Sequence, residues 1–107
     1  MAEFKVFRSP QFNEEIKQLS NHLIDRIVKI EEQLKTNPFA GKPLGYKWFR
    51  EKKLGKFRVY FLIYEELNAV YLVLTSDKKT QQKTISQVKL LFNNYREEIE
   101  NMLKETI

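Results

Sequence analysis

The chain of 107 residues is 42% hydrophobic and 31% charged, which indicates one globular domain, residues 1–107, and excludes a disordered tail or a collagen-like repeat. It has no Cys and one His, which excludes disulfides, thiolate metal sites and a Cys nucleophile. The formal net charge of +5 favours an anionic partner, and the lack of a signal-like or membrane-length apolar run favours a cytoplasmic protein.

The N-terminal third predicts a strand followed by helix. Residues 2–7 alternate as a short strand does. Ser9 and Pro10 then form a helix start, because Ser caps free N–H groups and Pro fits the first helical position. Apolar residues follow at a helical spacing: Phe12, Ile16, Leu19, Leu23, Ile27, Ile30 and Leu34. This spacing places them in one stripe along the helical segment.

Two polar points divide and end this helical segment. Asn37 precedes Pro38 and ends it, because a residue before Pro disfavours helical geometry. Ser20 and Asn21 form a second possible cap, so the segment is one long helix or, as we favour, two helices in a hairpin.

The middle of the chain predicts an antiparallel meander. Residues 39–45 read as a loop, since they contain two Gly and a Pro. Residues 46–51, 57–65 and 69–75 are rich in aromatic and β-branched side chains and are separated by hairpin-length connections. With the N-terminal strand added at an edge, they make a four-stranded sheet.

The C-terminal third returns to helical spacing. The apolar positions on one face are Val88, Leu91, Tyr95, Ile99, Met102 and Leu103, and Asn93–Asn94 is a possible break. The prediction is an α+β domain, with an N-terminal helical hairpin packed on a small, mainly antiparallel four-stranded sheet, a C-terminal helix, and all helices on one sheet face.

The positive charge is concentrated in residues 41–60, a window with seven bases and one acid, Glu51. Its bases are Lys42, Lys47, Arg50, Lys52, Lys53, Lys56 and Arg58. Gathered cations with interleaved aromatic residues are typical of single-stranded RNA binding, in which cations contact phosphates and rings stack on bases. The alternative is a solubilising strand surface with Tyr46 and Trp48 packed on the helices.

Metal and cofactor chemistry is not indicated. The acids come mainly as adjacent pairs on helical segments, which is typical of solvated faces, and no nucleotide-binding motif is present. His22 stands alone and is expected to be an ordinary helix residue, because a general base needs orienting partners. We therefore expect no metal and no cofactor.

The order of motifs resembles the RelE/ParE toxin superfamily of type II toxin–antitoxin systems, in particular its archaeal-type RelE-like members. The resemblance rests on Ser-Pro before a helix pair, then NPFAGKPLGYKWFREKKLGKFRVYFLIY, then AVYLVLTSDKK, and it covers roughly residues 3–85. It implies the RelE-like fold, a cognate antitoxin, and a ribosome-dependent endoribonuclease (mRNA interferase) that inhibits translation.

The resemblance also assigns residues by position. It implies that Lys47, Arg58 and Lys79 are catalytic, and it departs from the family at Phe49 and Ile85, where a lysine and a tyrosine are common. The neighbouring cations expected to bind RNA are Arg50, Lys52, Lys53, Lys56 and Lys78.

A metal-free mechanism follows from these roles. The substrate's 2′-OH attacks the adjacent phosphate, Arg58 stabilises its charge, Lys47 acts as base and Lys79 assists the leaving group. Tyr60 or Tyr64 is expected to stack on a base. Because these groups are weak acid–base catalysts, the ribosome is expected to supply much of the geometry.

Three other functions stay open at this stage. The first is a ParE-like inhibitor of DNA gyrase, the second a catalytically weakened RNA-binding relative, and the third a structural domain without a ligand. The antitoxin is expected to cover the basic hairpin, and the amphipathic segment 88–103 is expected to pack on the sheet rather than receive that partner.

Overall fold

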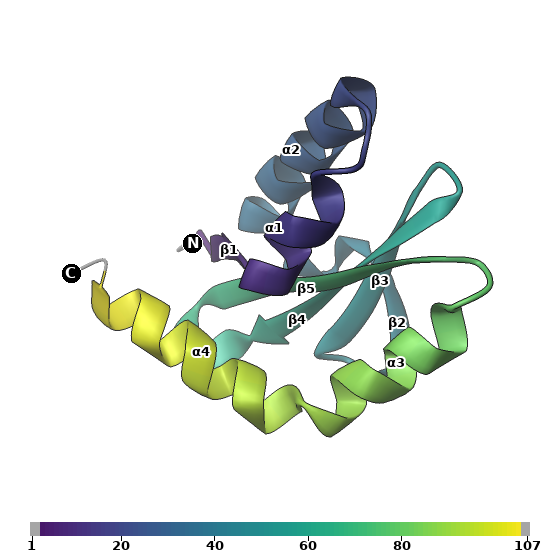
Figure 1. The fold of residues 1–107 in the computed structure, drawn as a ribbon. Helices are drawn as coiled ribbons and strands as arrows, with labels where there is room; N and C mark the ends of the chain where they lie inside the picture. The colour runs from purple at the N-terminus through teal and green to yellow at the C-terminus, as the bar shows by residue number, and fades with distance from the viewer. Residues whose placement is uncertain (1–2, 106–107) are drawn as a thin grey trace.

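The computed structural model describes residues 3–105 (Figure 1). The helices and strands are β1 (Lys5–Arg8), α1 (Pro10–Ile16), α2 (Asn21–Thr36), β2 (Lys42–Tyr46), β3 (Phe49–Leu54), β4 (Phe57–Tyr64), β5 (Ala69–Asp77), α3 (Gln81–Leu90) and α4 (Phe92–Glu105). Short 3-10 turns lie at Pro38–Ala40 and Glu65–Leu67. The expected first strand, 2–7, begins at a residue outside the described part.

The expected α+β class is confirmed, but the sheet has five strands rather than four. Their order is β1-β5-β4-β3-β2, with β1 parallel to β5 and the other pairs antiparallel. The extra strand is β2, whose first residues were expected to be a loop. Pro43 is tolerated there because β2 is an edge strand. Gly45 has a φ of +91° within the irregular pairing between Pro43 and Tyr46.

The helices cover both faces of the sheet, not one as expected. Val59, Phe61 and Ile63 of β4 pack towards α1 and α2, whereas Tyr60, Leu62 and Tyr64 pack towards α3 and α4. Figure 1 shows the two helix pairs on opposite sides of the strands. Both faces of this central strand are apolar, so both need a covering layer.

The expected break between the N-terminal helices is confirmed. The side chain of Ser9 accepts the N–H of Phe12 at the start of α1, and Ser20 caps α2 in the same way. The helix ends at Thr36, just before Asn37, as expected. The chain thus turns back between two capped helices, α1 and the longer α2, on one face of the sheet.

The C-terminal helices meet at Leu91, two residues before the expected break. The buried side chains of Tyr95 and Ile99 hold α4 on the sheet, and the hydroxyl of Tyr71 donates to Glu98 at 2.7 Å. The expected packing of this segment within the chain is confirmed.

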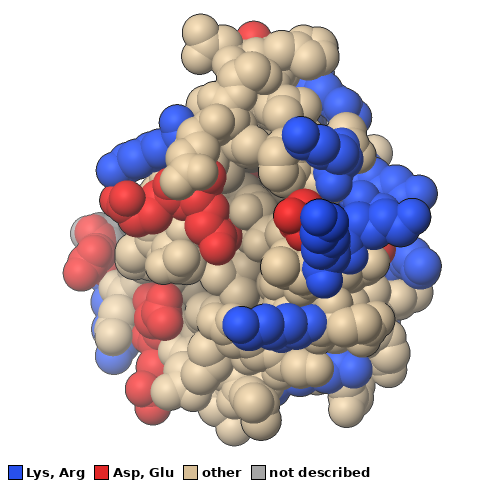
Figure 2. Space-filling model, turned by 45° about the vertical axis from the view of Figure 1, so that its right-hand side comes forward, with Lys and Arg blue, Asp and Glu red and all other residues tan. Residues whose placement is uncertain are grey.

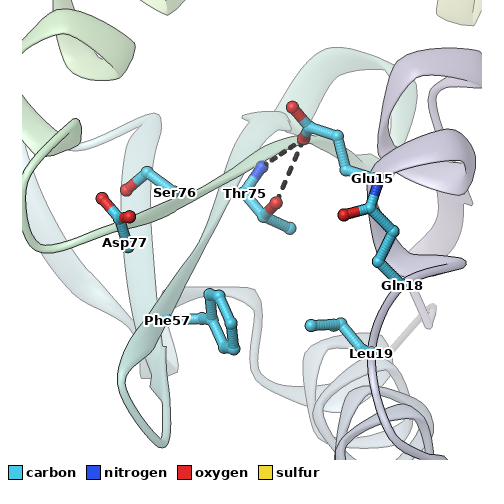
Figure 3. A pocket seen from close by; sticks show the side chains of 7 residues that line it. All are labelled: Glu15, Gln18, Leu19, Phe57, Thr75, Ser76 and Asp77. Atoms are coloured by element: carbon cyan, nitrogen blue, oxygen red, sulfur yellow. Dashed lines mark hydrogen bonds between the residues drawn. The ribbon is translucent and has the colours of Figure 1, made fainter.

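Side chains of α1 and of its N-cap, Ser9, complete the edge of β5 where β1 ends. The last β1–β5 pair is Arg8 with Leu72. Beyond it, the hydroxyl of Ser9 donates to the carbonyl of Val73 at 2.7 Å. The carboxylate of Glu15 accepts the N–H of Thr75 at 2.7 Å (Figure 3). These bonds satisfy backbone groups that would otherwise lack a partner, and they fix α1 against the sheet.

Candidate nucleic-acid interface

Cations gather at one end of the sheet, where the β3–β4 hairpin and the C-terminal end of β5 meet. Gly55, with a φ of +62°, begins the two-residue turn of the hairpin. Arg58 pairs with Lys53 on one side and with Ser76 on the other. We call the five cations at this place the basic end; they are Lys53, Lys56, Arg58, Lys78 and Lys79. In Figure 2 Lys and Arg gather on the right of the view, and most Asp and Glu lie on the left.

Arg58 carries donors that the protein itself does not use. Its Nη1 donates to the carbonyl of Phe57 at 3.3 Å. Its Nε is buried without a hydrogen-bond partner, and it is the sole side-chain nitrogen or oxygen of that kind within residues 3–105. An unpaired buried donor is costly, so an anionic ligand that reached Arg58 would supply a missing acceptor.

A polar group adjoins Arg58 on the α3 side of the sheet. The hydroxyl of Tyr60 bonds to that of Ser76 at 2.8 Å, and burial raises the pKa of Tyr60. Glu51, directly across from Tyr60 on β3, is only 4% exposed. Its two oxygens accept the side-chain amide of Gln81 at 3.2 and 3.4 Å. This face therefore holds a carboxylate, two hydroxyls and a guanidinium close together.

Three members of this group, Glu51, Ser76 and Gln81, were not among the predicted site residues. The signal for Glu51 was present in the sequence, since it is the single acid of the basic window. Glu51 also pairs with Tyr60, which is two residues from Arg58 on β4, so the two side chains lie on the same face of the sheet. Gln81 gave no signal, because it arrives from the start of α3 through tertiary packing.

Lys47 does not join the basic end. It was expected on a strand, but it lies in the turn between β2 and β3, because β3 begins only at Phe49. Phe49, the first residue of β3, pairs with Leu62, whereas Arg58 pairs with Lys53. Leu62 is four residues from Arg58 along β4, which is about 13 Å at about 3.3 Å per residue. The turn that holds Lys47 therefore lies at the opposite end of β3 from Arg58. At that other end, the Nζ of Lys47 lies 3.5 Å from the carboxylate of Glu65.

Two of the cations expected to bind RNA are used or directed elsewhere. Arg50 donates to the carbonyls of Lys47, Phe39 and Gly41 at 2.9, 3.1 and 2.8 Å, which ties the loop before β2 to the β2–β3 turn. Lys52 points to the opposite sheet face from Arg58, where it donates to the side chain of Gln33 on α2.

The aromatic residues expected to stack on RNA bases are unavailable. Tyr60 is fully buried and Tyr64 is 1% exposed, with its hydroxyl donating to the carbonyl of Phe92. The two departures from the family, Phe49 and Ile85, are also core residues on the α3 side. All four side chains fill the space between the sheet and the C-terminal helices, so they stabilise the fold.

A cavity of about 290 Å³ lies beside the basic end on the other sheet face, between the end of α1 and the ends of β4 and β5 (Figure 3). Its lining includes the carboxylates of Glu15 and Asp77 and no cation. Asp77 also bonds to Thr80, and that backbone hydrogen bond lowers the pKa of Asp77. An acid-lined cavity does not suit a phosphate.

Within the described residues, no group of three His, Asp or Glu side chains is placed to hold a metal ion. None of the helices in that part of the chain combines the length and apolarity needed to cross a bilayer.

Comparison with solved structures finds toxins of toxin–antitoxin systems. A free double mutant of the Escherichia coli toxin RelE has a TM-score of 0.66 and 16% identity, and the match covers 82% of this chain and 99% of that one. The toxin–antitoxin complex RelBE2 of Mycobacterium tuberculosis has a TM-score of 0.63 and 18% identity, and the match covers 73% of this chain and 94% of that one. The RelE–RelB complex of Pyrococcus horikoshii has a TM-score of 0.63 and 14% identity, and the match covers 71% of this chain and 96% of that one.

No protein-family model and no curated protein sequence matches the chain. At these low identities the structural likeness establishes the fold. The resemblance predicted from the motifs is therefore confirmed at that level, and the chain has the fold of the RelE toxins.

Proposed function

We propose that this chain is a RelE-like toxin that cleaves messenger RNA on the ribosome and is neutralised by a cognate antitoxin. The observation that carries the proposal is Arg58, a guanidinium with an unpaired buried Nε within a cluster of cations. A guanidinium binds phosphate oxygens through two parallel hydrogen bonds, and nearby lysines draw the RNA backbone towards it. The RelE fold of the chain supports the same assignment.

The reaction proceeds without added groups, because RNA contains its own nucleophile. The 2′-oxygen attacks the adjacent phosphorus, a 2′,3′-cyclic phosphate forms, and the bond from phosphorus to the 5′-oxygen breaks. Arg58 neutralises the charge that develops on the phosphate oxygens. Lys79, just beyond the end of β5, donates a proton to the departing 5′-oxygen.

The base that accepts the 2′-OH proton is proposed to be Glu51 in place of Lys47. Glu51 lies two pairing positions from Arg58, on the same face, whereas Lys47 lies at the far end of the hairpin. The carboxylate of Glu51 is now covered by Gln81, so RNA must displace that amide to reach it. This requirement fits a reaction that depends on the ribosome for orientation.

Inducible expression with a growth readout, followed by primer extension on ribosome-bound messenger RNA, tests the proposal. Arg58→Ala is expected to abolish growth inhibition and cleavage, and Glu51→Gln to slow cleavage by about 10²–10⁴-fold, as loss of a general base does. Lys47→Ala should keep full activity because Lys47 lies at the far end of the hairpin from Arg58. Lys5→Ala, on the remote strand β1, is the matched control.

Three results would contradict this function. Full toxicity of Arg58→Ala would remove the proposed phosphate ligand. Rapid cleavage of naked RNA by the purified protein would argue against dependence on the ribosome. Inhibition of DNA gyrase in a supercoiling assay, with messenger RNA left intact, would favour a ParE-like activity.

The antitoxin part of the proposal has its own test. Several structural neighbours are complexes of a RelE toxin with RelB. We propose that the cognate antitoxin covers the basic end and so blocks Arg58. A complex in which Arg58 and Lys79 remain open to solvent would refute this arrangement without refuting the toxin activity.

A further inference from the structure

A second group of cations lies on the sheet face opposite Arg58. Helix α2 and strand β3 enclose a groove of about 340 Å³ there. Its lining is Arg26, Lys29, Ile30, Gln33, Lys52 and Lys53. Four of these six residues are cations and none is an acid. Arg26, Lys29 and Lys52 belong to this side of the sheet, whereas Lys53 occupies the strand position paired with Arg58. Arg26, Lys29 and Gln33 stand three and four residues apart, so they share one side of α2 facing the hairpin.

Two of the three acids of α2 are engaged away from this groove, and the third, Asp25, is not part of its lining. Glu31 is held by Arg8 through two hydrogen bonds of 2.8 Å, and Glu32 pairs with Lys35. Neither Arg26 nor Lys29 forms an ion pair with any residue from 3 to 105. The groove therefore gathers positive charge from α2 and β3, with no acid in its lining.

We propose that this groove binds the phosphodiester backbone of RNA, as a second contact surface beside the basic end. The proposal rests on the proposed function, which brings the protein to RNA. Lys53 connects the two surfaces, because it lines the groove and is also the strand partner of Arg58. An RNA segment in the groove would lie close to the edge of the hairpin that carries the catalytic face.

The lining favours RNA over an acidic segment of a protein. Interfaces between proteins obtain most of their affinity from buried aromatic or aliphatic anchors in a desolvated centre. The only apolar residue of this groove is Ile30, which is 9% exposed and belongs to the core beneath. What the groove offers is separated point charges and the amide of Gln33, which suit a chain of phosphates.

The test measures RNA binding by the purified protein at several salt concentrations. The probe is a fluorescent single-stranded 2′-O-methyl RNA, which lacks the nucleophile and stays intact. Arg26→Gln/Lys29→Gln should weaken binding and make the slope of log K against log salt shallower by about 1.4, the value for two phosphate contacts on a single strand. The matched control, Lys5→Gln/Lys104→Gln, removes the same charge from β1 and α4 and should keep the wild-type slope.

Sedimentation with ribosomes forms the second arm. Weaker binding of both the short RNA and the ribosome would assign the groove to the messenger strand, and weaker binding of the ribosome alone would assign it to ribosomal RNA. An unchanged slope and unchanged ribosome binding, or an equal loss in the control, would overturn the proposal. So would a loss confined to affinity for the antitoxin, since the groove would then bind protein.

The two proposals fail in different ways. If Arg58→Ala abolishes cleavage while the groove variant binds RNA and ribosomes like the wild type, only the groove is refuted. If the wild-type protein binds neither RNA nor ribosomes, the proposed function is refuted and the groove with it.

Discussion

Replacing Ser9 with alanine is expected to destabilise the protein far more than an ordinary helix cap would. The hydroxyl of Ser9 accepts the N–H of Phe12 at 2.9 Å and donates to the carbonyl of Val73 at 2.7 Å, and the residue is 1% exposed. Loss of the cap costs about 1 kcal/mol, and a buried carbonyl left without a partner costs about 1–3 kcal/mol. Ser9→Ala should therefore lower the free energy of unfolding by about 2–4 kcal/mol.

The second cap of the helical hairpin provides a matched control. Ser20 accepts the N–H of Leu23 at 3.3 Å, but it is exposed and bonds to no strand. Ser20→Ala should cost only about 0.5–1 kcal/mol. Urea unfolding followed by circular dichroism measures both, and Ser9→Ala should also lower the Tm by at least about 8 °C. Equal losses in the two variants would refute the argument that Val73 needs this donor.

Three further predictions concern packing, the loop before β2 and alkaline pH. Gly41→Ala should destabilise by about 1–3 kcal/mol in urea unfolding, because a Cβ there would lie 2.7 Å from the ring of Phe61 and 2.8 Å from a backbone oxygen of β3. Arg50→Lys and Arg50→Ala should both lower the Tm, because a single ammonium cannot reach all three carbonyls that Arg50 contacts; equal Tm values for Arg50→Lys and the wild type would contradict this. Burial raises the pKa of Tyr95 to about 12 and also raises that of Tyr71 above its ordinary 10. These phenols ionise first in the unfolded chain, so stability should be unaffected below pH 10 and should fall as the pH rises above it, which urea unfolding at about pH 9 and about pH 11 would detect.

The sequence predicted correctly those helix ends that are marked by capping or helix-breaking residues. Ser9, Ser20 and the Asn37–Pro38 step mark helix ends by groups within a few residues, and the structure follows them. Strand β2 was missed because its pattern is weak. It contains Pro43 and Gly45, and it forms by pairing with β3 rather than from any preference of its own.

The number of covered sheet faces was predictable but was misjudged. The alternation in β4 correctly separated two sets of residues, and both sets are largely apolar. A strand that is apolar on both sides is buried on both sides, so helices were required above and below the sheet. The two helical segments on either side of the meander supply those layers.

The position of Lys47 depended on where a turn falls, which the sequence did not reveal. A strand from 46 to 51 would carry Lys47 along the same alternation as Glu51. In the structure a turn at residues 47 and 48 interrupts that alternation, and the hairpin register leaves Lys47 far from Arg58. Resemblance by order of motifs does not determine such a register, because one inserted residue moves a side chain to the other face.

The polar group beside Arg58 depends on an irregularity that strict alternation would miss. Tyr60 pairs with Leu74 and Phe61 with Leu72, so Val73 is an extra residue in β5. If β5 kept Val73 in strict alternation instead of forming this bulge, Ser76 would face α1 rather than the hydroxyl of Tyr60. With the bulge, Ser76 stands beside Arg58, and the carbonyl of Val73 receives the hydroxyl of Ser9. The same bulge thus sets the face on which Ser76 lies and supplies the carbonyl that accepts the Ser9 hydroxyl. Because deletion of Val73 would leave Ser76 paired with Arg58, that deletion should lower stability without moving Ser76 to the other sheet face.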